Sequence, residues 1–458
     1  MTTLTQRAAH FVHTLRLADV PPDVQRLARW HLADAIGVGI GAAGVPAHRA
    51  MLTRLLAEQP AGGVCTTLGF AETQTAPVAA LLNGTSMHSL EYDDTHMGSI
   101  VHGSAVIVPA AWAACEAQRR DMDELVRLVV AGWELLVRLG EASPGGFQRR
   151  GFQVTSVGGV VVAALLGAAA RGLDVDTCVH AAGIAGSQAG GIFAFLSNGS
   201  TVKALHPGWA AHGGLWAASY AAAGMTGPAR VLEDRFGLFA TYADDAEAGE
   251  RMATGLDSLG RDWRLADAAF KLHPVCHYIH AYLECAERLR AAIGEAVTTV
   301  RAVHCRVAPG AAPVICEPWA ARQQPRHGHD AKYSLPYCLA LALLGKPVDI
   351  AAMTASRMDD DALAMAQRIT WAPWADSGFP ARFGAQVDLV LADGTVLQEH
   401  VEQVAGSAER PPDAARLRAK FLTNVEPTLS EARAEAAWDG IVGHAPMASW
   451  TAQLRPGA

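Results

Sequence analysis

The chain has 458 residues, of which 50% are hydrophobic and 18% are charged, and its formal net charge is −8 at pH 7. That length is more than one compact domain usually holds, so we expect two domains. A negative net charge without a run of Lys or Arg excludes the electrostatic footprint of a protein that binds nucleic acid or an anionic membrane, and it leaves a small molecule as the expected partner.

The cysteines and the first residues of the chain indicate the compartment. None of the eight cysteines has C-x-x-C spacing, and residues 1–20 lack the apolar core of a signal peptide. We therefore expect reduced thiols in a cytoplasmic protein. The most hydrophobic window, residues 157–170, is too short to cross a bilayer of about 30 Å, and its small residues suit a closely packed helix in a globule.

The first half of the chain has helical periodicity. From residue 23 to about residue 260, segments rich in Ala, Leu and Gly alternate with short breaks that contain Gly or Pro. Asp23 supplies a favourable negative charge near the N-terminus of the first helix. The expected helices include residues 22–43, 104–119, 122–140, 156–171, 176–189 and 207–223.

The pattern changes after about residue 270. Residues 300–307 alternate as a strand does, and residues 386–401 indicate two strands around the turn at 392–394. Helices are expected at 333–344 and 360–368, and the Pro-rich residues 309–325 are expected to form a connecting loop. Residues 412–440 return to a helical pattern. The predicted fold is therefore mainly α with a smaller α+β domain: a helical domain over 1–268, an α+β domain over 269–408, and C-terminal helices over 409–458 that return to the helical domain.

Four polar clusters interrupt the apolar segments. They are residues 88–96 with His102 beyond them, 151–156, 203–208 and 271–280. The acids and histidines of the first cluster can supply a base, an acid and an orienting partner, or they can simply cap helices. The same residues include usable metal ligands, but they lack i, i+4 helix spacing with a third ligand evident elsewhere, so we expect no metal.

Lys203 is an isolated lysine in an apolar stretch. It is either a solvated side chain or, if it faces a pocket, the partner of a substrate carboxylate or of an enediolate. His206 precedes Pro207 and can equally be a residue at a helix start. The last cluster has the same two interpretations, although three histidines, a tyrosine and a thiol are more than packing requires.

Three motifs in this order resemble the MmgE/PrpD family, which includes 2-methylcitrate dehydratase, cis-aconitate decarboxylase and iminodisuccinate epimerase. They are N-G-T-S-M-H-S-L-E-Y-D-D-T at 83–95, K-A-L-H-P-G-W-A-A-H at 203–212 and Y-S-L-P-Y at 333–337. The resemblance covers nearly the whole chain. It implies a large helical domain built from both ends of the chain, a smaller α+β lid domain, a homodimer, and an active site between the domains that needs no metal or cofactor.

The resemblance also assigns roles to residues and shows three departures. The family's D-D-T segment, the histidine after it and the lysine of K-x-x-H are matched by Asp93, Asp94, Thr95, His102 and Lys203. Glu91 stands where the family usually has Asp, and Gln153 replaces the histidine of G-x-H-P-T. Cys276 stands where the decarboxylase has a catalytic histidine, with His277 adjacent and His280 at a position where the family widely has histidine.

We expect a lyase of the 2-methylcitrate dehydratase type acting on a small carboxylic acid. Asp93 or a neutral histidine would take a proton beside a carboxylate, and His102 or Tyr278 would protonate the departing hydroxyl. Cis-aconitate-type decarboxylation, epimerisation of an amino-linked dicarboxylate and non-catalytic carboxylate binding are the alternatives. The candidate catalytic residues are Asp93, His102, Lys203 and His277, and the candidate substrate-binding residues are Glu91, Asp94, Thr95, Gln153, His206, Cys276, Tyr278 and His280.

Overall fold

The computed structural model describes residues 2–60, 62–197 and 199–456, and its chain divides into two compact units. Within the described residues, the helical unit consists of Met1–Ser89, Asp93–Ala268 and Asp413–Ala458. The mixed unit consists of Leu90–Tyr92 and Ala269–Pro412. Both ends of the chain therefore belong to the helical unit, and the three residues before Asp93 belong to the mixed unit.

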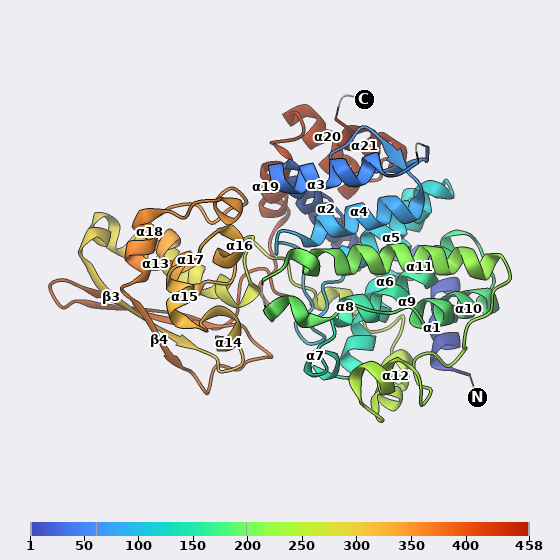
Figure 1. Cartoon of the computed structure of the whole chain (residues 1–458), viewed down its shortest axis with the longest axis horizontal. Helices are drawn as coiled ribbons and strands as arrows, with labels where there is room; N and C mark the ends of the chain where they lie inside the picture. The colour runs from blue at the N-terminus through green and yellow to red at the C-terminus, as the bar shows by residue number, and fades with distance from the viewer. Residues whose placement is uncertain (1, 61, 198, 457–458) are drawn as a thin grey trace. The chain divides into compact units, whose positions relative to one another are not determined.

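The helical unit is a layered assembly of helices (Figure 1). Helix α9 is apolar on almost every side and is buried along nearly its whole length, as expected for a helix in a core. Helix α6 is amphipathic, and its N-cap Asp121 accepts a hydrogen bond from the backbone N–H of Glu124. The helices are α1 (Leu4–Thr14), α2 (Pro22–Gly44), α3 (Pro46–Ala57), α4 (Ala76–His88), α5 (Ser104–Ala117), α6 (Met122–Ala142), α7 (Gly146–Arg149), α8 (Val154–Val157), α9 (Gly159–Ala170), α10 (Val175–Gly186), α11 (Leu205–Ala222), α12 (Ala248–Asp257), α19 (Ala414–Val425), α20 (Glu431–Val442) and α21 (Met447–Thr451).

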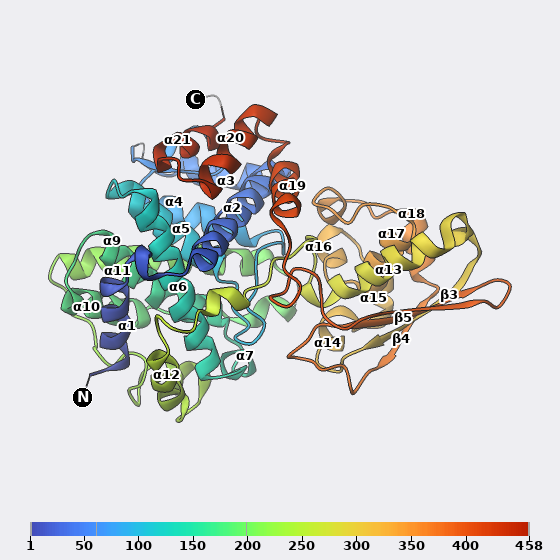
Figure 2. The same cartoon turned by 180° about the vertical axis from the view of Figure 1, so that it is seen from behind.

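The C-terminal helices pack on the N-terminal ones. Helices α19 and α20 both contact α2, and Figures 1 and 2 show the C-terminal helices beside α2. The small β1 (Cys65–Thr66) and β2 (Thr73–Gln74) form an antiparallel pair in the same unit. The six predicted helices are confirmed as α2, α5, α6, α9, α10 and α11, and their ends differ from the prediction by at most three residues.

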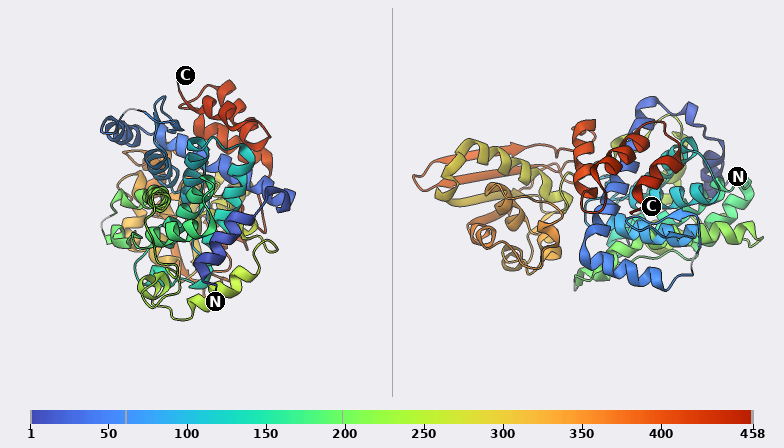
Figure 3. Two further views of the ribbon diagram at one scale, coloured as in Figure 1. Left: turned by 90° about the vertical axis from the view of Figure 1, so that its right-hand side faces the viewer. Right: turned by 90° about the horizontal axis from the view of Figure 1, so that it is seen from above.

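The mixed unit is built on one four-stranded sheet. Its strands are β3 (Val300–Val307), β4 (Ile369–Pro373), β5 (Ala385–Leu391) and β6 (Val396–Val401), in the order β4-β3-β5-β6. β3 pairs parallel with β4 and antiparallel with β5, and β5 pairs antiparallel with β6. Helix α13 (His280–Ile293) packs on β5 and β6, and α17 (Leu335–Leu343) packs on α13 (Figures 2 and 3). The remaining helices are α14 (Ala312–Ile315), α15 (Trp319–Gln323), α16 (Gly328–Ala331) and α18 (Asp360–Ala366).

The predicted fold class, mainly α with a smaller α+β domain, is confirmed, and two details of the mixed unit differ from prediction. The stretch 309–325 is not only a loop, because it contains α14 and α15. Proline lies in the first turn of α14 and at the N-cap of α15, positions where its missing N–H costs nothing. The sequence also showed no sign of β4, a short strand that ends in proline and lies at the sheet edge, where proline is tolerated.

Two further properties concern the whole described chain. All eight cysteines are buried and none forms a disulfide. Among the described residues, no helix combines the length and the apolar character that crossing a membrane requires.

Candidate active site

Four segments of the helical unit bring polar side chains together at helix ends. His88 is the last residue of α4, and Asp93 and His102 lie in the connection between α4 and α5. Gln153 is the N-cap residue of α8, and His206 lies in the first turn of α11. Because these residues lie at helix ends and in a connection, side chains from several helices can converge on one place.

Two glycines explain how α4 and α11 come close enough. A Cβ atom on Gly208 would lie 2.3 Å from the carbonyl oxygen of Leu81, and one on Gly84 would lie 2.7 Å from the Cα atom of Gly208. The two helix backbones therefore touch at these positions, which only glycine permits. His88 lies one turn after Gly84 and His206 two residues before Gly208, so this contact places both histidines beside Gln153.

Asp93 is the centre of the cluster and is fully buried. Its Oδ2 atom lies 2.7 Å from Nδ1 of His88 and 3.3 Å from Nδ1 of His102. The two imidazole rings lie edge to face, with centroids 4.9 Å apart. Among the described residues, Oδ1 of Asp93 has no hydrogen-bond partner.

The electrostatics of Asp93 follow from these contacts. Burial by itself would raise the pKa of the Asp93 carboxyl, but the charges and hydrogen bonds of His88 and His102 together hold the pKa well below its usual range. Asp93 is therefore ionised at neutral pH. The contacts with His88 and His102 suit a carboxylate that orients a histidine, and the role of Asp93 as general base stays a prediction.

Gln153 connects His88 to His206. Its amide nitrogen lies 3.1 Å from Nε2 of His88, and its amide oxygen lies 2.7 Å from Nδ1 of His206. Burial, followed by the charges of His88 and Lys203, lowers the pKa of His206 to about 4. His206 is therefore neutral at physiological pH.

Thr95 and Lys203 flank this cluster. The Thr95 hydroxyl lies 3.4 Å from Nδ1 of His102, and the hydroxyl of Thr155 accepts a hydrogen bond from the backbone N–H of His102. Lys203 belongs to the 3-10 turn Thr201–Ala204 that leads into α11, and its side chain is half-buried. The side chain of His102 keeps 14% exposure, whereas those of His88 and Asp93 are fully buried.

His88, Asp93 and His102 also form a group whose potential ligand atoms lie within 4.8 Å of one another. The hydrogen bonds argue against a metal ion there. Nδ1 of His88 needs its proton to donate to Asp93, and Nε2 accepts from Gln153, so His88 offers a metal no lone pair without losing a bond. The predicted absence of a metal stays a prediction.

Comparison with known proteins identifies the family. The MmgE/PrpD N-terminal domain matches residues 6–251, and the MmgE/PrpD C-terminal domain matches residues 273–440. The chain belongs to the MmgE/PrpD family. The family is one of enzymes, so the prediction of an enzyme of the lyase class is confirmed at the level of the family.

Several relatives of this MmgE/PrpD protein align over most of their length. The cis-aconitate decarboxylase-like protein oryM of Aspergillus oryzae is 27% identical over 88% of this chain and 86% of its own. The cis-aconitate decarboxylase of Aspergillus terreus is 25% identical over 96% of this chain and 93% of its own. The cis-aconitate decarboxylase of Mus musculus is 26% identical over 93% and 88%, respectively.

Asp94, next to Asp93 in this MmgE/PrpD protein, lies outside the cluster. Its Oδ2 atom lies 2.7 Å from Nδ1 of His31, and its Oδ1 atom accepts a hydrogen bond from the backbone N–H of Ser104. Both Asp94 and His31 are buried. Asp94 therefore satisfies an N–H at the start of α5, and its predicted contact with substrate stays a prediction.

Glu91 belongs to the mixed unit of the MmgE/PrpD fold. It has a positive φ of 55°, and the buried ammonium of Lys271 lies 3.2 Å from its carbonyl oxygen and 3.6 Å from its carboxylate. The Tyr92 hydroxyl donates to the carbonyl of Leu272. The carboxylate of Glu91, predicted to bind substrate, is thus engaged with Lys271.

The other predicted residues lie together in the mixed unit. His277 and Tyr278 pack edge to face on Phe383, and His277 also packs on His280. His280 donates from Nε2 to the carbonyl of Val275; burial, and then the charges of His277, His273 and Lys271, hold its pKa well below the usual value. Burial, with a smaller contribution from Cys276, raises the pKa of Tyr278, so this phenol is a weak acid.

Two residues were missing from the predicted site: His88 and Lys271. Each lay within a polar cluster that the sequence pattern identified. The signal for His88 was its place in the motif at 83–95, five residues before Asp93. Nothing in the sequence showed that its two ring nitrogens would join Asp93 to Gln153, because that depends on the crossing of α4 and α11.

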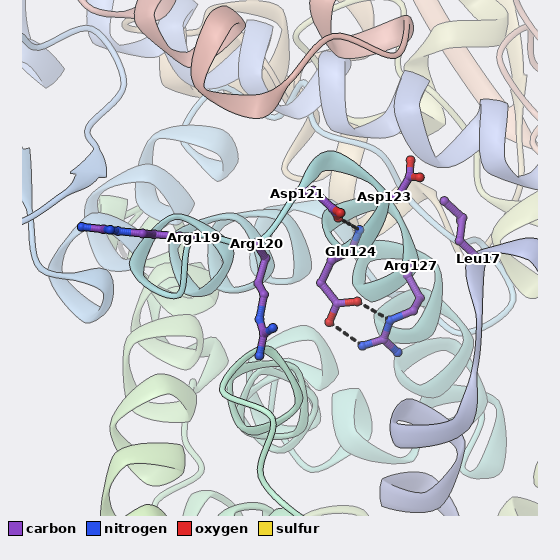
Figure 4. Close-up of a pocket in the computed structure, with 7 residues that line it drawn as sticks. All are labelled: Leu17, Arg119, Arg120, Asp121, Asp123, Glu124 and Arg127. Atoms are coloured by element: carbon purple, nitrogen blue, oxygen red, sulfur yellow. Dashed lines mark hydrogen bonds and ion pairs between the residues drawn. The ribbon is translucent and has the colours of Figure 1, made fainter.

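A surface hollow of about 520 Å³ near the start of α6 is a separate feature (Figure 4). It contains as many acids as arginines, and these side chains bond to the protein itself. Arg127 donates to Glu124, and Arg120 donates to the carbonyl of Ala170. This hollow offers no net charge to a carboxylate. Its lining residues are Leu17, Arg119, Arg120, Asp121, Asp123, Glu124 and Arg127.

Proposed function

We propose that this MmgE/PrpD protein is a metal-independent lyase that acts beside a carboxylate of a small di- or tricarboxylic acid. The observation that carries the proposal is the contact of His102, which is partly exposed, with the buried and ionised Asp93. A histidine held by a carboxylate is a general base that becomes a stabilised imidazolium after it takes a proton. The family match supports the lyase class.

The first candidate reaction is elimination of water from a hydroxy acid, of the 2-methylcitrate dehydratase type. His102 takes the proton from the carbon beside the carboxylate, and the electron pair of that C–H bond forms the new C=C bond. The C–O bond breaks, and the hydroxyl leaves as water with the proton that His102 returns. Lys203 pairs with the carboxylate and neutralises the charge that develops on it.

The second candidate reaction is decarboxylation, and it is favoured by the relatives, several of which are named cis-aconitate decarboxylase. In a β,γ-unsaturated acid, the C–C bond to the leaving carboxylate supplies the electron pair of a new C=C bond as carbon dioxide departs. The far carbon of the old double bond then takes a proton. His102, as an imidazolium beside Asp93, is the donor in that case.

A screen of hydroxylated and unsaturated di- and tricarboxylic acids in heavy water, followed by proton NMR, tests the proposal. We expect loss of water or of carbon dioxide from at least one acid. Lys203→Ala is expected to raise KM by about 10–100-fold, because it removes a charged partner of the carboxylate. His304→Gln, a change at an exposed histidine of the mixed unit, is the control and should leave turnover unchanged.

Other outcomes of the screen contradict the proposal. Deuterium exchange without net conversion would indicate an epimerase, and carboxylate binding without exchange or turnover would indicate a non-catalytic binding protein. Activity that disappears with a chelator would show that the site needs a metal. Retention of full activity by Lys203→Ala would show that the lysine does not bind substrate.

We also propose that the protein is a homodimer that associates through one face of α11. Leu205, Trp209, Trp216 and Tyr220 follow one another at spacings of four or seven residues and are 37–55% exposed. Trp216 and Tyr220 have ring centroids 6.0 Å apart. A helix face this rich in exposed aromatic residues is typical of an interaction surface, and a two-fold axis would bury the same face on both copies.

Charge on this face is expected to break the dimer. The double change Trp209→Asp and Trp216→Asp should halve the mass measured by light scattering, because four carboxylates would be buried in a symmetric interface. Phe236→Asp is the matched control: Phe236 is 73% exposed but is not on α11, and its replacement should leave the mass unchanged. A monomeric wild-type protein, or a dimer that survives the double change, would contradict this surface assignment.

A further inference from the structure

The four side chains from His206 to Asp93 form an unbroken line of hydrogen bonds. His206 bonds to Gln153 at 2.7 Å, Gln153 to His88 at 3.1 Å, and His88 to Asp93 at 2.7 Å. All four residues are buried, with exposures of 7% or less. Water therefore does not substitute for these partners, and each atom's role as donor or acceptor follows from its neighbour.

The direction of the line is set by Asp93. An ionised carboxylate only accepts, so Nδ1 of His88 carries a proton. An amide nitrogen only donates, so Nε2 of His88, which faces the amide nitrogen of Gln153, carries a lone pair. That lone pair faces the amide nitrogen of Gln153, which donates. The amide oxygen of Gln153 then faces His206, so the proton of His206 is on Nδ1.

Nε2 of His206 is consequently a lone-pair acceptor. No hydrogen bond reaches this atom from the described residues, whereas Nδ1 is held by Gln153. Gln153 fixes this arrangement in a way that an imidazole could not, because an amide has a permanent donor end and a permanent acceptor end and does not ionise.

We propose that Gln153 is a positioning residue that sets the tautomer of His206, and that His206 thereby selects substrates that present a hydroxyl or an amine beside their carboxylates. A neutral lone-pair acceptor binds an O–H or N–H donor and repels a carboxylate oxygen, which has only lone pairs. Lys203, in the turn just before His206, provides the complementary preference for carboxylate. This inference rests on the proposed carboxylic-acid site and names the group that distinguishes its substrates.

Binding of matched acids tests the preference. Citrate and tricarballylate share one carbon skeleton and differ in one hydroxyl, as do malate and succinate. By titration calorimetry on the wild-type protein, we expect the hydroxylated member of at least one pair to bind about 10–100-fold more tightly, because its rival leaves the buried acceptor unpaired. Equal affinity in both pairs, or tighter binding of the acid without a hydroxyl, would overturn the proposal.

Two variants separate selection from folding. His206→Phe removes the acceptor, and Gln153→Leu removes the group that sets the tautomer, so both should reduce the affinity ratio of each pair toward one. Affinity for tricarballylate and succinate should change much less than affinity for citrate and malate. His304→Gln, outside the helical unit, should preserve the ratio. A ratio that persists in both site variants would overturn the proposal.

A spectroscopic measurement decides the tautomer without any ligand. In protein labelled with ¹⁵N-histidine, two-bond ¹H–¹⁵N correlations report which ring nitrogen is protonated, and the signal of His206 is assigned by its absence in His206→Phe. We expect the Nδ1–H form in the wild type and its loss in Gln153→Leu. An Nε2–H form in the wild type would overturn the inference, whether or not the protein turns over any acid. Failure of the substrate screen with the Nδ1–H form present would instead contradict the proposed function.

Discussion

Replacing Asp93 by asparagine is expected to lower kcat by about 10²–10⁴-fold, the scale seen when the carboxylate that orients a catalytic histidine is neutralised. The Asp93→Asn side chain would have nearly the same shape but would lose the charge that holds the protons on Nδ1 of His88 and His102. His102 would then lose both its orientation and the stabilisation of its imidazolium. Initial rates with the acid identified in the screen measure the effect.

The Asp93→Asn change should also alter how the stability of the protein depends on pH. Since the pKa of Asp93 in the folded protein lies below its value of about 3.9 in an unfolded chain, its contacts stabilise the fold above that pH. That contribution disappears as the pH falls through the folded-state pKa. The Asp93→Asn variant should therefore be less stable than the wild type at pH 7 and should lose less additional stability on acidification.

Asp94→Asn is the matched control for Asp93→Asn. Asp94 is equally buried, but it serves His31 and the start of α5. We expect this variant to lose about 1–3 kcal/mol of unfolding free energy through the weakened buried bonds, while its kcat falls far less than that of Asp93→Asn. Equal losses of kcat in the two variants would show that the adjacent acids act alike and would sink the assignment of Asp93 as the orienting carboxylate.

Replacing Lys420 by methionine is expected to destabilise the helical unit by about 3–5 kcal/mol, because it leaves a buried carboxylate without its partner. Nζ of Lys420, on α19, lies 2.7 Å from Oδ1 of Asp34, on α2, and both side chains are only 4% exposed. Burial raises the pKa of Asp34 even though Lys420 opposes the shift. For a unit of this size the expected fall in Tm is about 5–8 °C, and α19 should become more sensitive to limited proteolysis.

Two further variants sharpen the test of Lys420. Arg418→Met removes an ion pair from the same helix, but its partner Glu435 and Arg418 itself are 43% and 40% exposed, so the cost should stay below about 1 kcal/mol. The double change Lys420→Met and Asp34→Leu should recover most of the lost stability, because no charge remains buried. A single Lys420→Met variant as stable as Arg418→Met would contradict the account.

Much of the fold could be predicted from sequence periodicity. The helices at 22–44 and 122–142 follow from apolar spacing bounded by caps and breaks, and the strands at 300–307 and 385–401 follow from alternation. Periodicity failed where a segment was too short to show a period. β4 has five residues and ends in proline, and the prolines that indicated a loop lie in the first turn of α14 and at the N-cap of α15.

The candidate site also has a part that the sequence could predict and a part that it could not. The segment at 83–95 and Lys203 could be recognised as candidate site residues, because acids, histidines and a lysine interrupt apolar helices there. The sequence could not distinguish Asp93 from Asp94. The two are adjacent in a loop, and the direction of each side chain depends on residues that only the fold brings close. The sequence also could not show that Glu91 would be engaged by Lys271, 180 residues away.

The fold class, the family and the set of polar residues from which a site can be built follow from the amino-acid sequence alone, because these depend on local spacing and on motifs. The tertiary structure shows which of those residues lie together. Asp93 contacts His88 and His102, and Gln153 links His88 to His206 beside the contact of Gly84 with Gly208. Tautomers and pKa values depend on burial and on residues brought together from distant parts of the chain, so they cannot be predicted from a local sequence pattern.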